Sequence, residues 1–146
     1  MKKSLSYVTS ITLFLSLFYC SDEGLSPDQR EYIIPQNNIS YYDDLLPMLE
    51  GKCGFECHSN NVQVITIPLL NKDEFIDYQL SFTGEVLVDT ILHKIDPTRA
   101  PLYKVVTEFD YLGNNDVMPP LAARRSPLTE NQIEGIKQWI AEGAPD

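Results

Sequence analysis

Cys53-Gly54-Phe55-Glu56-Cys57-His58 is the stretch that decides the fold, because two thiols followed by an imidazole are typical of covalent haem attachment. Each vinyl group of the haem needs one cysteine sulfur, and the iron needs an axial ligand, which the adjacent histidine can supply. The usual motif has two residues between the cysteines, whereas this chain has three. Gly54 is expected to absorb the additional residue, since glycine adopts backbone angles closed to other residues.

Met118 is the predicted second axial ligand, because a thioether stabilises reduced iron and raises its potential. It lies in the run Asn114-Asn115-Asp116-Val117-Met118-Pro119-Pro120, where the two prolines restrict the backbone and would hold a ligand with little reorganisation. His93 is the alternative ligand at this position. Taken alone, a methionine more often fills a gap in the core.

Two interpretations of the cysteines without haem stay open. Zinc could be held by Cys53, Cys57, His58 and a fourth ligand such as His93, because thiolates and imidazoles are its usual partners. In an oxidising compartment, Cys53 and Cys57 could instead form a disulfide.

Residues 1–19 predict an export signal. Lys2 and Lys3 form its basic start, and the apolar run over 8–18 is short for a membrane span. Cys20 ends the run and resembles the lipidated cysteine of bacterial lipoproteins. We therefore expect an exported chain with a lipid anchor in the membrane, on the periplasmic side of the cell envelope.

Charge and cysteine count limit the partners and the class of protein. Removing the signal would leave 9 of the 11 basic residues against all 21 acidic ones, so the net charge would change from −10 to −12. Such a charge argues against nucleic acid as a partner and favours a redox partner protein with a basic surface. Of the three cysteines, Cys20 ends the signal and the other two lie in the haem-like motif, so none is left for a disulfide framework.

Local signals predict an all-α domain over 40–146, preceded by a polar tether over 20–39. Asn71 and Thr129 are expected as N-caps, the latter with Gln132 in a capping box, and Gly143 as a C-terminal stop. The predicted helices cover residues 40–49, 71–80, 86–95, 102–106 and 129–143, with an irregular loop over 111–125.

From about residue 40 to its end, the chain resembles the planctomycete-type domains of the cytochrome c superfamily. In that family a short helix precedes the haem motif, and a Leu-Tyr segment, a Met-Pro-Pro loop and a helix ending in Trp-Ile and Gly-Ala follow. The corresponding segments are Asp44-Leu45-Leu46-Pro47-Met48-Leu49, Pro101-Leu102-Tyr103, Met118-Pro119-Pro120, Leu128-Thr129-Glu130-Asn131-Gln132-Ile133 and Gln138-Trp139-Ile140-Ala141-Glu142-Gly143-Ala144.

The resemblance implies a class I cytochrome c-like fold, with short helices and irregular loops around one haem c. It implies thioether bonds at Cys53 and Cys57, axial ligation by His58 and Met118, and electron transfer rather than enzymatic catalysis. Two alternatives remain. The third spacer residue and the serine after the histidine also suit a binding or interaction module that has lost its haem, and an open iron site would suit a peroxidase-like enzyme.

Overall fold

The computed structural model describes residues 31–58, 67–113, 117–120 and 126–146, with only the backbone at 55–57. As predicted, the fold is all-α: within these ranges the only strand-type pairing is an isolated bridge between Gln79 and Val86. In chain order the elements are η2 (Tyr41–Leu45), α1 (Leu46–Leu49), η3 (Glu50–His58), α2 (Lys72–Ile76), α3 (Leu92–Ile95), η4 (Pro97–Arg99), α4 (Pro101–Thr107) and α5 (Glu130–Glu142).

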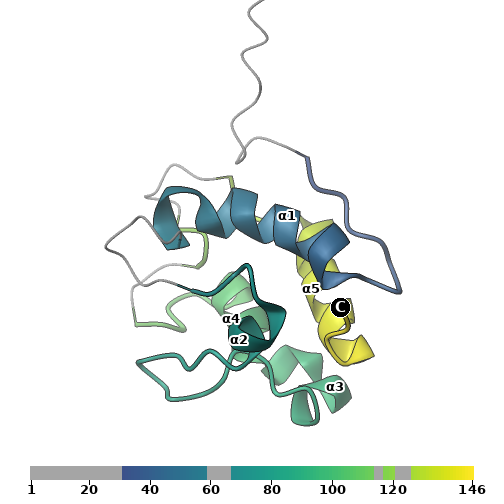
Figure 1. Ribbon diagram of the computed structural model, residues 1–146. Coiled ribbons are helices and arrows are strands. Elements are labelled where there is room, and N and C mark those ends of the chain that lie inside the picture. The colour runs from purple at the N-terminus through teal and green to yellow at the C-terminus, as the bar shows by residue number, and fades with distance from the viewer. Residues whose placement is uncertain (1–30, 59–66, 114–116, 121–125) are drawn as a thin grey trace, which may run out of the picture.

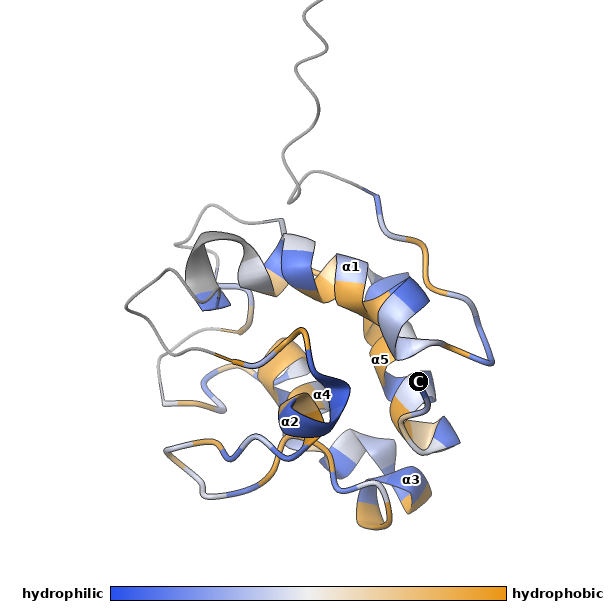
Figure 2. Cartoon of the chain, viewed as in Figure 1, coloured by the Kyte–Doolittle hydropathy of each residue, from blue (hydrophilic) through white to orange (hydrophobic). Residues whose placement is uncertain are grey.

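The first three elements form one continuous helical run, which lies across the molecule from α2, α3 and α4 (Figure 1). The C-terminal helix α5 connects the two sides, because it contacts η2 as well as α3, η4 and α4. Figure 2 shows that α5 and the helical run carry most of their hydrophobic residues toward this interior. Its largest fully buried side chains include Trp139, Tyr41 and Phe75, and the Tyr41 ring lies 5.5 Å from Trp139 and 5.6 Å from Phe75.

The predicted helix ends at the two strongest signals are confirmed. Thr129 and Gln132 form the reciprocal capping box of α5, and Gly143 closes that helix in the left-handed region with φ of 94°. Asn71 caps α2 by accepting hydrogen bonds from the N–H groups of Asp73 and Glu74.

Two predicted helices are much shorter than expected. The first ends at Ile76 instead of Leu80, because the chain turns back on itself: Leu80 donates to the Glu85 carbonyl and Leu87 donates to the Tyr78 carbonyl. In the second, only Leu92–Ile95 is helical. These pairings occupy backbone groups that the end of the first predicted helix and the start of the second would need.

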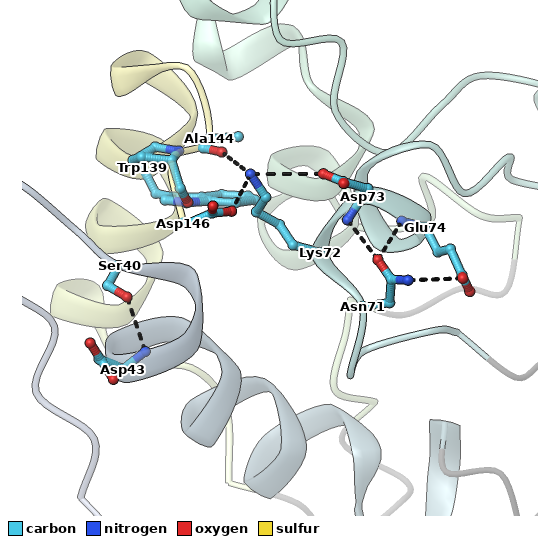
Figure 3. A network of polar contacts seen from close by, with 10 residues as sticks. Ser40, Asp43, Asn71, Lys72, Asp73, Glu74, Trp139, Ala144 and Asp146 are labelled. Carbon is cyan, nitrogen blue, oxygen red and sulfur yellow. Dashed lines mark hydrogen bonds and ion pairs between the residues drawn. The ribbon is translucent and has the colours of Figure 1, made fainter.

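The C-terminus is held against α2 by Lys72, as Figure 3 shows. The Lys72 amine donates to the Ala144 carbonyl at 3.2 Å and pairs with the Asp146 carboxylate at 2.7 Å. The Trp139 indole N–H donates to the carbonyl of Pro145 at 2.9 Å. The last residues of the chain therefore bind the largest of the fully buried side chains.

The described part of the predicted tether, residues 31–39, packs along α5. Asn131 binds the Ile34 backbone twice, accepting from its N–H at 2.8 Å and donating to its carbonyl at 3.0 Å. The Glu142 carboxylate accepts from the N–H groups of Asn38 at 2.9 Å and Ile39 at 3.0 Å. Ile34 and Ile39 are buried in the core, so this segment is part of the folded domain.

Glu142 makes this packing pH-dependent. Partial burial would raise the pKa of its carboxyl, but hydrogen bonds from the Gln138 amide and the N–H groups of Ile39 and Asn38 outweigh this effect and lower the pKa below its ordinary value of 4.5. A carboxyl whose pKa is lower in the folded chain stabilises it above the ordinary value, and this stabilisation is lost as the pH falls through the folded pKa.

Replacing Glu142 by Gln is therefore expected to reduce the free energy of unfolding by about 1 kcal/mol at neutral pH. The difference from the unchanged chain should shrink as the pH falls below 4.5, which urea denaturation at several pH values would measure. The matched control is Glu134→Gln on the same helix, whose carboxylate pairs with Lys137 at the surface. An equal effect of both variants, or a difference that does not change with pH, would contradict the role of Glu142.

Candidate haem site

The cysteine–histidine motif lies inside a helix. The run begins at Ser40, whose hydroxyl accepts from the Asp43 N–H while its own N–H donates to the Asp44 carboxylate. It then continues without a break through η3 to His58. The predicted helix before the motif is confirmed, and it extends through the motif itself.

Helical backbone at the motif places positions 53 and 57 four residues apart, one turn along the helix. Positions three and four apart are both surface neighbours in a helix, at about 5–6 Å between Cβ positions. A spacer of three residues therefore keeps the two positions on one side of the helix, as a spacer of two would. The hydrogen bonds of η3 are of the π type. Each of them joins residues five apart, one more than in an α-helix.

Cys53 and Met118 come from distant parts of the chain and pack against the same hydrophobic core. Both side chains are half-buried, as is His58 at the end of η3. The Met118 N–H donates to the Val105 carbonyl of α4 at 2.8 Å, and the bond from Met118 to the buried Pro119 is cis. The methionine segment is thereby attached to α4.

Several predicted features lie outside what the structure describes. These are the export signal over 1–19, Cys20 and the tether up to residue 30, the side chain of Cys57, and residues 59–66, 114–116 and 121–125. The remaining residues of the predicted loop over 111–125 adopt turns, bends and irregular backbone.

Gly54 has a different role from the one predicted. It is not among the described glycines with positive φ, which are Gly84, Gly113 and Gly143, and its backbone belongs to η3. Gly54 instead allows a close approach, because a Cβ built there would lie 3.0 Å from Cδ1 of Leu69. The extra spacer residue is accommodated by the helix and not by an unusual glycine conformation.

His93 lies at α3 and takes part in the start of that helix. Its Nδ1 accepts from the Asp89 N–H at 2.8 Å, while the Asp89 carboxylate accepts from Ile91 and Leu92. Burial lowers the pKa of the His93 imidazole, assisted by Arg99 and Lys104 and opposed by the Asp89 and Glu85 carboxylates. A neutral imidazole that accepts at Nδ1 carries its proton on Nε2, so this arrangement favours a structural role over metal ligation.

The zinc alternative includes Cys57, whose side chain lies outside what the structure describes. Among the described side chains, no group of three or more His, Cys, Asp or Glu residues lies close enough to hold a metal ion. His93, which the sequence suggested as the fourth zinc ligand, instead accepts a hydrogen bond at Nδ1 from the Asp89 N–H.

Three buried residues that the sequence analysis did not assign to the site are connected to the motif: Lys52 and Leu69, which lie next to it, and Tyr41, which binds Leu69. Lys52 directly precedes Cys53 and is only 5% exposed. Tyr41 and Leu69 are joined by a short hydrogen bond, from the phenol to the Leu69 carbonyl at 2.6 Å. No sequence pattern marks this bond, because it joins residues 28 positions apart.

Comparisons with protein-family models, with curated proteins and with solved structures find no match for this chain. Within the described residues, every helix is too short or too polar to cross a membrane.

Proposed function

We propose that the chain is an exported electron-transfer protein with a class I cytochrome c-like fold. Cys53 and Cys57 would bind one haem c covalently, and His58 and Met118 would be its axial ligands. A lipid anchor at Cys20 and a redox partner protein with a basic surface belong to the same proposal. The observation that carries it is the unbroken helix through the motif. In a helix, a spacer of three residues keeps the two cysteine positions on one side.

The residues present suit the chemistry of the haem group. Two thiols one helical turn apart are followed directly by an imidazole, so the covalent and axial bonds would come from one short stretch. Met118 lies on the core that Cys53 also contacts, which supports a thioether ligand from the opposite end of the domain sequence. When bound, haem c supplies a one-electron iron couple.

The protein would contribute burial, ligation and rigidity. Half-buried Cys53, His58 and Met118 limit the access of water while leaving part of each side chain near the surface. Met118 is tied to α4 through Val105, and a ligand on fixed backbone reorganises little when the charge on the metal changes.

The test is covalent haem attachment. The full-length chain, produced with haem-maturation machinery and then denatured, is expected to keep a Soret band and to gain the mass of one haem. Cys53→Ser and Cys57→Ser should each remove one thioether bond, and the double variant should lose the covalent haem altogether. A denatured wild-type chain with neither Soret band nor added mass would contradict the proposal and favour the haem-free binding module.

A further inference from the structure

Tyr41 occupies the first turn of the helical run, far from the motif along the helix. Its side chain is fully buried, and its hydroxyl donates to the Leu69 carbonyl at 2.6 Å. Burial, with smaller contributions from Tyr42 and Glu50, raises the pKa of the Tyr41 phenol well above its ordinary value. The phenol therefore keeps its proton and remains a hydrogen-bond donor over the physiological range.

Leu69 links this hydroxyl to the middle of the motif. Its main chain is bound by Tyr41, while its side chain reaches Gly54, where even a methyl group would lie only 3.0 Å from Cδ1. Leu69 is itself 6% exposed, so it has little room to move away. Gly54 stands 13 residues after Tyr41 along the helical run, whereas Leu69 connects the two through one hydrogen bond and one side-chain contact.

We propose that Tyr41 and Leu69 are positioning residues for the cysteine–histidine motif: the phenol fixes the Leu69 main chain, and the Leu69 side chain fixes the helical turn at Gly54. This inference rests on the proposed function, because haem attachment is what gives the position of that turn a purpose. The contacts involve protein atoms alone, so they can be tested separately from haem binding.

The test uses the amide resonance of Gly54 in the folded chain without haem. Tyr41→Phe keeps the ring and removes the hydroxyl, and we expect it to shift the resonances of both Leu69 and Gly54. Tyr42→Phe is the matched control, since this neighbouring tyrosine is 46% exposed; it should leave the Gly54 resonance in place. Loss of stability alone does not shift resonances of the folded state, so the readout separates positioning from a general structural role.

The role of Leu69 is tested by repeating the change in a Leu69→Ala background. The carbonyl that accepts from Tyr41 is still present there, but the contact with Gly54 is gone, so Tyr41→Phe should no longer shift the Gly54 resonance. A second variant, Leu69→Val, keeps the carbonyl and alters only the side chain, and should shift Gly54 by itself. An unchanged Gly54 resonance in Tyr41→Phe, or a shift that persists with Leu69→Ala, would overturn the inference.

In the haem-loaded protein, Tyr41→Phe is also expected to shift the midpoint potential, whereas Tyr42→Phe should not. An unchanged potential in both variants would overturn the link to haem. Failure of the wild-type chain to take up haem would instead count against the proposed function, because the resonance measurements need no haem.

Discussion

Gly135→Ala is expected to destabilise the chain by up to about 2 kcal/mol, although alanine is the better helix former. A Cβ at this position of α5 would lie 2.5 Å from Cγ2 and 2.7 Å from Cβ of Ile34. Overpacking of this kind costs roughly 1–3 kcal/mol, against a gain of about 1 kcal/mol from replacing a helical glycine. The crowded atoms lie close to the Ile34 backbone, so rotating the side chain does not relieve the contact.

Asn131 binds both the N–H and the carbonyl of Ile34. The whole segment over 31–39 would therefore have to move to relieve the contact. Urea denaturation, followed by the fluorescence of the single tryptophan, Trp139, measures the effect because that ring is fully buried. The control is the same substitution in an Ile34→Gly background, where the opposing side chain is absent. There Gly135→Ala should be neutral or stabilising by up to about 1 kcal/mol, and an equal loss in both backgrounds would contradict the contact.

The sequence predicted those elements whose signals are local. The ends of α5 follow from Thr129, Gln132 and Gly143, which lie within one turn of the backbone groups that they bind or terminate. Asn71 likewise identifies the start of α2. Each of these signals acts on the nearest residues, so no knowledge of the fold is needed to interpret it.

The failures depend on contacts that are distant in sequence. Apolar spacing alone predicted a helix over 86–95, yet Ile91, Leu92 and Ile95 are 77%, 64% and 84% exposed, and the backbone before them pairs with residues 76–80. The packing of residues 31–39 relies on Asn131 and Glu142, about a hundred positions away. A polar segment with prolines gives no local indication that such partners exist.

For the candidate site, the ligand residues stay a prediction, and the residues that support them were not predicted. Cysteine, histidine and methionine are the residue types that a haem would need, so a motif suggests them without a fold. The contact between Leu69 and Gly54 depends on how the chain folds back onto the helix. The sequence therefore predicted an unusual backbone conformation for Gly54 and not this contact. The helical backbone of η3 includes the three residues between the cysteines, so they need no unusual backbone conformation.

Met118→Leu is expected to lower the midpoint potential of the haem-loaded protein by roughly 0.2 V or more, since axial ligands set haem potentials over a range of about 0.8 V. Leucine has nearly the volume of methionine, so the change should cost less than about 1.5 kcal/mol of stability. The haem should stay attached, because its covalent bonds would come from Cys53 and Cys57. Redox titration of the purified protein, followed by its visible spectrum, measures the effect.

Met48→Leu is the matched control, because it removes a thioether from a fully buried position in α1 and leaves Met118 intact. Its potential should equal that of the unchanged protein. If Met118→Leu also kept that potential, Met118 would not be the ligand, and His93 or an open iron site would take its place. The two can then be separated with His93→Ala: a change in potential would identify the histidine as ligand, whereas no response would favour the open site of a peroxidase-like enzyme. The comparison therefore tests the methionine through its sulfur, since both variants remove a thioether and only Met118 is proposed as an iron ligand.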